Sequence, residues 1–568
     1  MDGKGGIFGL LFDRNGNPLK AGAALRISNR PDGDSVFERR GKYYLLTHFE
    51  ESPGAIYLTE MAKSPDGRLK PVHFRNIDLS MVGGTVINCA ASKTPWDTHL
   101  ASEEDYFFDA YWFDPATKNY TAQHIDYCDK GPDGELTGGY TPPQFAPAAN
   151  LSAWCGYVKG VRDDYLKDNS LFTPYNYGFN IEISLDEGGN PLIVNGSKHY
   201  ALGKFTPEIA VVMPDSRTVY LTDDGDYAGL FMFVADKEKD LSSGALYMAK
   251  WVQRDSVGGG AARVEWVKLG HGNEGAIKSL IDRRPVFSDI FDLEDPLYCP
   301  DGFKLLKSGA AGIMCLRLKD GTNGSAISDK FEGVDEVKRA AAFLESRKYG
   351  AYLGATSEFH KAEGLAYNPY NRVLYLAVSS LKESMLDITH DPANDIRLPG
   401  NRCGAVYEGR VSGNKRDTHG RPVNSSFVLT SMESMLEGKP LKPGELYAGD
   451  HACHPAFIAN PDNLGYYGGL LFIGEDSSGH FNNMVWAYDT GKKTLTRIMT
   501  VPTGGEVTGS FAQFKSKRVR YMFINIQHPL EDSARNAMGV KVNSGFLKEA
   551  GDGSRRGYVG YISLPETK

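Results

Sequence analysis

Short apolar strands separated by polar turns recur along the chain, and four of these stretches align with one another. They begin at Glu208, Glu363, Asp462 and Glu506, with the sequences EIAVVMPDSRTVYLTDDG, EGLAYNPYNRVLYLAVSS, DNLGYYGGLLFIGEDSSG and EVTGSFAQFKSKRVRYMFINIQHP. In each stretch an acidic residue precedes a strand of apolar or small residues, a polar turn follows, and a second apolar strand ends in polar residues. This pattern is typical of a β-hairpin.

Two further stretches follow the same pattern with different residues. In GGTVINCAASKTPWDTHLASEED, residues 83–105, a strand predicted at Thr85–Ile87 runs directly into Cys89, which takes the place of the acidic residue. Residues 27–52 form a looser sixth repeat. Hairpins that share one phase, with no dominant helical pattern, indicate a β-propeller. We therefore predict an all-β fold, a six-bladed β-propeller with loop and short helical insertions, in which residues 1–568 form a single domain.

The segments between the hairpins are predicted to be loops or insertions. Residues 129–175 are rich in Gly, Pro, Asn and Asp, so we expect loops that decorate one face of the propeller. The best helix candidate is VDEVKRAAAFLESRKYGAYLG, which begins at Val334 and has loosely helical spacing of its apolar residues.

The repeat predicts which residues meet in space. The innermost strand of each blade lines the central channel, so residues at one phase of the repeat gather at one channel mouth. We expect convergence of Cys89, Glu208, Glu363, Asp462 and Glu506. Acidic residues at the ends of the second strands are expected to form a second tier nearby: Glu103, Glu104, Asp223, Asp224, Glu475 and Asp476.

Convergent acidic groups repel one another, and a multivalent cation removes that cost. Carboxylate and carbonyl oxygens favour calcium, whereas the soft thiolate of Cys89 favours a transition metal such as iron. Lys361, two residues before Glu363, shares its strand face and is expected to point into the same mouth. Candidate ligands or proton carriers are His48, His360, His451, His454, His480 and His528.

Each of these residues also has a structural interpretation. A single cysteine at a strand end is most often a small buried residue. Acidic residues at strand ends are often turn formers, Lys361 could be a solvated surface lysine, and single histidines are more often structural. The shared phase of the acidic residues is what favours a common site.

Composition excludes several classes of protein. The net charge is −8 and no basic block is present, so a nucleic-acid partner is not expected. No apolar run approaches the roughly 18 residues of a membrane span. The seven cysteines are scattered without a CxxC pair, which argues against a zinc ribbon or thioredoxin-type site. The first residues lack a secretion-signal pattern, so we expect a cytoplasmic chain or one whose export signal has been removed.

Five motifs, in order, resemble those of a known family. NCAASKTPWDTHLASEE, from Asn88, is similar to the Asn-Cys-Ala-Gly-Gly-x-Thr-Pro-Trp-Gly-Thr-Trp-x-x-x-Glu-Glu signature of the PhoX-type alkaline phosphatases. FHKAEGL, NPDNL, GGEVTG and NIQHP resemble that family's later motifs, and the matches extend from about Val82 to Pro529. The resemblance implies a six-bladed propeller that hydrolyses phosphomonoesters at a cluster of Fe3+ and Ca2+ in one channel mouth.

The resemblance also assigns roles to residues. It implies that Cys89 binds iron, that Glu208 and Glu363 bridge metal ions, and that Asp462 is a further ligand. Glu104 and Glu506 complete the expected ligand set. Cys89 and Lys361 are the expected catalytic residues.

The sequence departs from the family pattern at several positions. Asp97 and His99 stand where the signature has Gly and Trp, and Ala91 and Ser92 replace a Gly-Gly pair. Lys361 stands where some relatives carry Arg, so a bidentate grip on phosphate would be lost. These departures bear on substrate preference more than on metal binding.

Together these features predict a metal-dependent phosphatase that acts on small phosphate monoesters. The family implies a periplasmic or secreted chain, and we expect a monomer that needs neither nucleic acid nor membrane. Two alternatives remain open: a calcium-stabilised propeller that binds without turnover, and a metal-dependent phosphodiesterase or lactonase on the same scaffold.

Overall fold

The structure is a computed structural model that describes residues 6–105, 113–114, 119–120, 156–309, 312–322, 324–509, 511, 513–516, 519–530 and 556–565. Most of the predicted loop region, residues 129–155, lies outside the described residues, as do Cys128 and Cys155.

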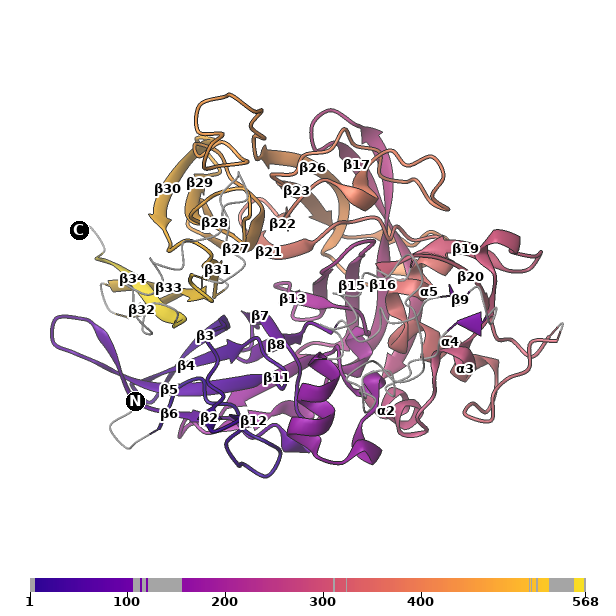
Figure 1. Cartoon of the computed structure of the whole chain (residues 1–568), viewed down its shortest axis with the longest axis horizontal. Coiled ribbons are helices and arrows are strands. Elements are labelled where there is room, and N and C mark those ends of the chain that lie inside the picture. The colour runs from indigo at the N-terminus through magenta and orange to yellow at the C-terminus, as the bar shows by residue number, and fades with distance from the viewer. Residues whose placement is uncertain are drawn as a thin grey trace.

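Within the described ranges, six groups of antiparallel strands surround a common centre, which Figure 1 shows near the middle of the molecule; the third and fourth groups are joined into one nine-stranded sheet by the pairing of Ala261–Arg263 with Ser431–Glu433. We call them blades 1 to 6 in chain order. The innermost strand of each blade contacts those of its two neighbours, in the ring order β3, β7, β13, β21, β27, β31 and back to β3. The predicted six-bladed β-propeller is therefore confirmed, whereas the single-domain assignment of residues 1–568 stays a prediction.

The strands of each blade run outward from the centre in chain order. Blade 1 contains β3 (Pro31–Arg39), β4 (Lys42–Phe49), β5 (Ala55–Lys63) and β6 (Leu69–Asn76). Blade 2 contains β7 (Asn88–Lys93), β8 (His99–Glu103), β11 (Asn180–Leu185) and β12 (Pro191–Ile193). Blade 3 contains β13 (Pro207–Val212), β14 (Thr218–Asp223), β15 (Leu230–Lys237), β16 (Asp240–Asp255) and β17 (Ala261–Asn273).

The second half of the ring follows the same plan. Blade 4 contains β21 (Ala362–Asn368), β22 (Val373–Val378), β23 (Ala405–Ser412) and β26 (Val428–Glu437). Blade 5 contains β27 (Pro461–Tyr467), β28 (Leu470–Glu475), β29 (Met484–Asp489) and β30 (Thr494–Thr500). In blade 6, β31 (Glu506–Thr508) and β32 (Gln513–Ser516) both pair with β33 (Val519–Gln527), which also pairs with β34 (Tyr558–Pro565).

Helical insertions follow blade 3 and pack against it. They include α2 (Glu274–Asp282), α3 (Phe287–Ile290), α4 (Val334–Leu344) and α5 (Ser346–Tyr352), with a small sheet of β18 (Phe291–Glu294), β19 (Lys304–Lys307) and β20 (Ile313–Leu318). The helix predicted from Val334 is present as α4 and α5. The apolar residues of α4, among them Phe343 and Leu344, join a core with Leu246 and Met248 of β16.

Strand β22 shows why the blade sequences are continuously apolar rather than alternating. Every residue from Val373 to Val378 is buried. Leu374 and Leu376 pack into a core shared with blade 3, whereas Tyr375 and Ala377 pack into a core shared with blade 5. Because each blade is covered on both faces by its neighbours, both sets of side chains must be apolar.

The innermost strands approach one another closely where the ring narrows. A Cβ added at Gly364 of β21 would lie 2.3 Å from the Asp462 carbonyl oxygen of β27 and 2.6 Å from the Leu464 nitrogen. The ring closes between blades 6 and 1 through side chains: Thr508 Oγ1 donates to the Pro31 carbonyl over 2.7 Å, and Asn525 Nδ2 donates to the Asp32 carbonyl over 2.5 Å.

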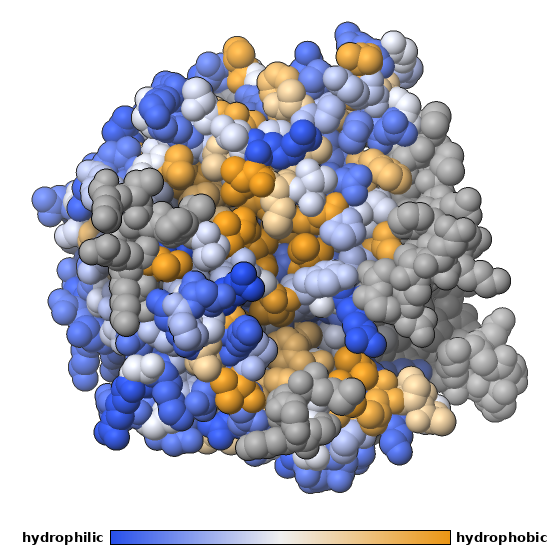
Figure 2. Space-filling view, turned by 90° about the vertical axis from the view of Figure 1, so that its left-hand side faces the viewer, coloured by the Kyte–Doolittle hydropathy of each residue, from blue (hydrophilic) through white to orange (hydrophobic). Residues whose placement is uncertain are grey.

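The side of the molecule that carries β6, β30 and β34 has a mixed surface. Figure 2 shows apolar side chains near the middle of this face and hydrophilic ones around them. Exposed large apolar residues on these strands include Val72, Ile498 and Tyr558. None of the described helices has the length and apolar character needed to cross a membrane.

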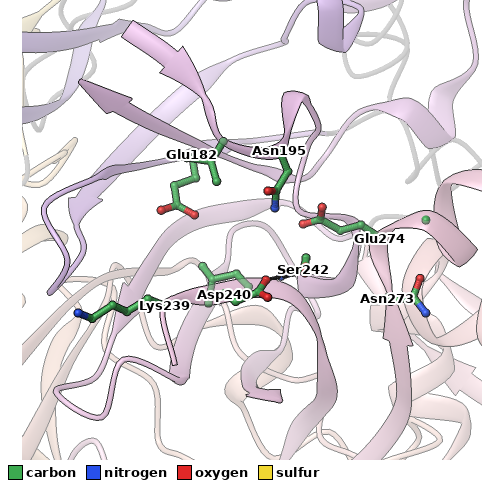
Figure 3. Close-up of a pocket in the computed structure, with 10 residues that line it drawn as sticks. Glu182, Asn195, Lys239, Asp240, Ser242, Asn273 and Glu274 are labelled. Atoms are coloured by element: carbon green, nitrogen blue, oxygen red, sulfur yellow. Dashed lines mark hydrogen bonds between the residues drawn. The ribbon is translucent and has the colours of Figure 1, made fainter. Parts of the chain in front are cut away.

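A polar pocket of about 500 Å³ lies between blade 2, the β15–β16 turn and the start of α2. Figure 3 shows the side chains that surround it, including Glu182, Asp240 and Glu274. Behind the pocket His199 is buried, with Nε2 3.0 Å from Glu182 Oε2 and Nδ1 2.5 Å from Glu274 Oε1. His199 therefore ties the third strand of blade 2 to helix α2.

The close approach at Gly364 predicts a stability cost for a methyl group. Because the neighbouring atoms belong to the backbone of β27, Gly364→Ala must push blades 4 and 5 apart. We expect the free energy of unfolding to fall by about 1–3 kcal/mol. Gly449→Ala is the matched control, since nothing lies within 4 Å of its added Cβ. Denaturant titration that gave both variants the same stability would contradict this packing.

The position of His199 predicts a pH-dependent contribution to stability. Burial alone would lower its pKa, but Glu182 and Glu274 outweigh burial and raise the pKa from 6.5 to about 9. This shift corresponds to about 3 kcal/mol, fully present below about pH 6.5 and lost as the pH rises through about 9. Denaturation of wild type and His199→Gln should show a stability gap at pH 6 that narrows by pH 9.5. A gap that stays constant would show that His199 contributes by packing alone.

Candidate metal centre

Five of the six innermost strands begin with the same irregularity. In blades 1 to 5 the first residue of the innermost strand pairs with the last residue of the next strand, and the register then shifts by one residue. Such a β-bulge leaves a residue unpaired and re-aims its side chain. The residues that directly follow the first paired position are Asp32, Cys89, Glu208, Glu363 and Asp462.

The start of blade 2 differs from the sequence prediction. The strand expected at Thr85–Ile87 is wrong, because β7 begins at Asn88 and Cys89 lies at the beginning of a strand rather than after one. The backbone has positive φ at Gly83, Gly84 and Ile87, which extended strands do not adopt. The apolar residues of this segment fill buried space before the strand starts.

The acidic residues of the predicted second tier fall into two sets, because successive residues of a strand point in opposite directions. Glu103, Asp223 and Glu475 end their strands and bind the scaffold: Lys198 Nζ lies 2.7 Å from Glu103, Arg347 Nε 2.7 Å from Asp223, and Trp486 Nε1 2.7 Å from Glu475. In each of these blades the residue after the strand end interacts instead with the bulge residues. These following residues are Glu104, Asp224 and Asp476.

Three groups of side chains lie close enough to hold cations. Within each group the potential ligand atoms are within 4.8 Å of one another. The groups are Glu50 with Cys89 and Glu104, Glu208 with Glu363 and Asp462, and Asp462 with Asp476 and Glu506. Asp462 joins the second group to the third, and the Cys89 thiol, 2.9 Å from Glu208 Oε2, joins the first to the second. We call these residues, with Asp32 and Asp224, the acidic cluster.

Burial and mutual repulsion oppose the charged forms of the groups in the acidic cluster. Burial, followed by the charges of Glu363 and Asp32, raises the pKa of Glu208 well above its usual value. Burial, followed by Asp32 and Glu208, raises the pKa of the Cys89 thiol in the same way. At the half-buried positions Glu50 and Asp476, burial and the nearby Glu506 raise the pKa to about 7 and about 6. The groups therefore share protons unless positive charge binds among them.

Lys361 lies at the edge of the acidic cluster. Its Nζ is 3.0 Å from Glu363 Oε1 and 3.8 Å from Asp224 Oδ1, and 35% of its side chain is exposed. Burial alone would lower its pKa, but these carboxylates raise the pKa well above the usual value. The ammonium group is thus charged, anchored on one side and open to solvent on the other.

The structure separates the candidate histidines. His528 Nε2 lies 3.2 Å from Glu506 Oε2, and His48 Nδ1 lies 2.6 Å from the Cys89 carbonyl oxygen, so both contact the cluster residues. His360 pairs with Asp226, and His480 pairs with Glu475. Two more, His451 and His454, lie in the loop between blades 4 and 5.

All of the residues expected to bind metal lie together: Cys89, Glu104, Glu208, Glu363, Asp462 and Glu506. Their roles as ligands, and the catalytic roles of Cys89 and Lys361, stay predictions. The sequence analysis missed Asp32 and Glu50. In blade 1, Asp32 lies in the bulge, and Glu50 directly follows the end of β4, as Glu104 follows the end of β8 in blade 2. The PDGD turn pattern conceals Asp32, and aligning that aspartate with Cys89 and Glu208 is the signal that could have found it.

Comparisons with known proteins identify the family and a similar fold. A family model described as alkaline phosphatase PhoX matches residues 68–530. The fold is similar to the structure of Pseudomonas fluorescens PhoX in complex with vanadate, a transition state analogue. That likeness has a TM-score of 0.56 and 17% sequence identity, and covers 95% of this chain and 89% of that one. At this identity the likeness shows the fold alone.

Two other solved structures are more distant. Saccharomyces cerevisiae Sqt1 has a TM-score of 0.25 and 7% identity, over 91% of this chain and 100% of that one. The propeller domain of the Trilobed protease from Pyrococcus furiosus has a TM-score of 0.25 and 5% identity, over 90% and 94%. No curated protein sequence matches the chain. Because the family match spans most of the chain and every blade contributes to it, the chain belongs to the PhoX family of alkaline phosphatases.

Proposed function

We propose that this protein hydrolyses phosphate monoesters at an iron–calcium centre held by the acidic cluster, with Lys361 binding the phosphoryl group. Membership of the PhoX family supports a phosphatase of that type. The observation that carries the finer proposal is the convergence of carboxylates and one thiol from all six blades beside a charged, partly exposed lysine.

The residues fit the metals that the family implies. Carboxylate oxygens from several blades suit calcium, and the thiol of Cys89 among them suits iron. The raised pKa values of Glu208, Glu363 and Asp462 show that burial opposes their charged forms, which a bound cation would stabilise. In addition, Asp32 Oδ1 is buried without a hydrogen-bond partner among the described residues.

In this proposal Cys89, Glu104, Glu208, Glu363, Asp462 and Glu506 hold the metal ions, together with Asp32 and Glu50. The ions would supply Lewis acidity, which neutralises phosphoryl oxygens and activates water for attack. Lys361 contributes a fixed point charge that binds a phosphoryl oxygen and stabilises the charge that develops on it. Glu363 and Asp224 hold Nζ in place, so the lysine needs little reorganisation when substrate binds.

We further propose that the protein matures in the periplasm or outside the cell. Two disulfides, Cys299–Cys315 and Cys403–Cys453, are present in the described part of the chain. Such bonds persist in oxidising compartments and are rare in the cytosol. This favours the exported alternative over the cytoplasmic one. The monomeric state and the absence of a nucleic-acid partner stay predictions.

Metal analysis of purified protein, combined with a substrate panel, separates the alternatives. Iron and calcium in fixed ratio with hydrolysis of p-nitrophenyl phosphate would support the proposal. Calcium without iron or turnover would identify a calcium-stabilised binding propeller. Preference for a bis-ester or a lactone over the monoester would identify a phosphodiesterase or lactonase.

Cys89→Ser tests the assigned iron ligand. The change keeps nearly the same size but replaces a soft thiolate with a harder, more basic oxygen. We expect iron per chain and phosphatase turnover to fall together while calcium is partly retained and the blades remain folded. If Cys89 serves only in packing, the variant should lose about 1–3 kcal/mol of stability and keep its metal content and activity.

Lys361→Met tests the phosphate-binding role. The substitution keeps the aliphatic length and removes the charge, so we expect kcat to fall about 10²–10³-fold for p-nitrophenyl phosphate while metal content is unchanged. Lys361→Arg is the matched control, because it keeps the charge and should retain most of the activity. Equal kcat in Lys361→Met and wild type would remove this lysine from the mechanism.

A further inference from the structure

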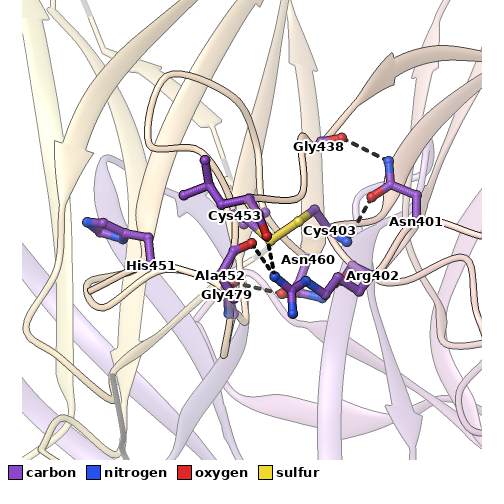
Figure 4. Close-up of a disulfide and its surroundings, with 12 residues drawn as sticks. Asn401, Arg402, Cys403, Gly438, His451, Ala452, Cys453, Asn460 and Gly479 are labelled. Carbon is purple, nitrogen blue, oxygen red and sulfur yellow. Dashed lines mark hydrogen bonds between the residues drawn. A yellow bond between two sulfur atoms is a disulfide. The ribbon is translucent and has the colours of Figure 1, made fainter. Parts of the chain in front are cut away.

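A long connection without regular structure joins blades 4 and 5 close to the acidic cluster. It runs from residue 438 to residue 460, between β26 and β27, and connections longer than about 12–15 residues without regular structure are uncommon. The Cys403–Cys453 disulfide fastens this connection to the loop that precedes β23. Figure 4 shows the disulfide surrounded by Asn401, Arg402, Asn460 and Gly479.

One side of the disulfide is linked to Asp462 through Asn460. The Asn460 nitrogen donates to the Cys403 carbonyl over 2.9 Å, and Asn460 Nδ2 donates to the carbonyls of Ser379 and Arg402 over 2.8 and 3.0 Å. Asn460 has φ of 42°, and β27 begins at the next residue, so Asn460 sets the direction in which the strand enters its bulge. Asp462 lies within that bulge, between the paired residues Pro461 and Leu464.

The other side of the disulfide is linked to Asp476. The nitrogens of Ala452 and Cys453 both donate to the Gly479 carbonyl, over 2.8 and 2.9 Å. A Cβ at Gly479 would lie 2.4 Å from Cys453 Sγ, so the loop after Asp476 presses directly on the disulfide. The Asp476 nitrogen in turn donates to the Asn460 carbonyl over 3.3 Å.

We infer that the Cys403–Cys453 disulfide is a positioning element for Asp462 and Asp476, and that cation affinity at the Asp462–Asp476–Glu506 group depends on it. The inference rests on the proposed function, since it assumes that the acidic cluster binds cations. The two carboxylates belong to one strand pair, yet burial and mutual repulsion oppose their approach. The disulfide, with the hydrogen bonds of Cys403 to Asn460 and of Cys453 to Gly479, holds the segments before β27 and after β28 together. The free-energy cost of bringing the two carboxylates close is therefore met when the protein folds rather than when a cation binds.

The second disulfide provides a matched control within the same protein. Cys299–Cys315 lies in the β18–β20 insertion, where Cys315 belongs to β20, and no residue of the acidic cluster belongs to that small sheet. Both bonds close loops, of 16 and 50 residues in sequence separation, so removing either one should lower stability. The inference predicts a loss of cation affinity for Cys403–Cys453 alone.

The experiment compares Cys403→Ala/Cys453→Ala with Cys299→Ala/Cys315→Ala in the full chain. Protein stripped of calcium is titrated with Ca²⁺ by calorimetry, at a temperature where circular dichroism shows all forms folded. Removal of Cys403–Cys453 should weaken the tightest calcium binding by about 10–100-fold, as loss of groups that orient ligands generally does. Removal of Cys299–Cys315 should leave the affinity within about twofold of wild type, a margin of about 0.4 kcal/mol.

A second variant keeps the disulfide and breaks its link to the cluster. Asn460→Gly tolerates the positive φ but removes the side-chain bonds to Ser379, Arg402 and Ser477. It should lower the affinity for calcium, as the double substitution does. If Cys403→Ala/Cys453→Ala does not fold, the calcium affinity of Asn460→Gly tests the inference by itself. Wild-type affinity in folded Asn460→Gly, or in the folded double variant, would overturn the inference alone. Wild-type protein that binds no calcium would overturn the proposed function, and the inference with it.

Discussion

The repulsion among buried acidic groups at one end of the ring is the constraint on which the rest of this structure depends. Glu208, Glu363 and Asp462 come from three blades, yet their carboxylate oxygens lie within 4.8 Å of one another. Burial and the charges of nearby carboxylates raise the pKa of all three groups. Such an arrangement persists because the scaffold is rigid, and it is suited to binding multivalent cations.

The rigidity comes from the way each blade presents its acidic residues. The bulge at the start of the innermost strand directs one side chain to the cluster. At the end of the next strand, two successive acidic residues point in opposite directions, one into the scaffold and one toward the cluster. Glu103 and Asp223 form buried ion pairs with Lys198 and Arg347, which fix the strand ends. Their neighbours Glu104 and Asp224 are then held against the bulge residues. One acidic residue of each pair stabilises the frame, and the other supplies the site.

The contact between blades 1 and 6 completes the frame; in the described part of the chain each of these blades is built from one end only. Blade 1 is built from residues 31–76, and the described strands of blade 6 lie within 506–527 and 558–565. The two blades share an apolar core that includes Tyr521 and Phe523, and the side chains of Thr508 and Asn525 bind the backbone of β3. These bonds reach the Pro31 and Asp32 carbonyls, beside the bulge of blade 1. Ring closure therefore involves the backbone beside Asp32, which links this part of the acidic cluster to the contact between blades 1 and 6.

The sequence alone determined the fold class, the six hairpins and the phase that unites Cys89, Glu208, Glu363 and Asp462, because hydrophobic periodicity and turn chemistry are local properties. It could not determine where β7 begins, since the apolar residues of Thr85–Ile87 satisfy burial equally well in a strand or in an irregular segment with positive φ. It also could not separate Glu103 from Glu104, or find Asp32 in a turn-like PDGD. Only the tertiary structure decided these, because the direction of a side chain at a bulge depends on the register between strands, and its partners lie hundreds of residues away.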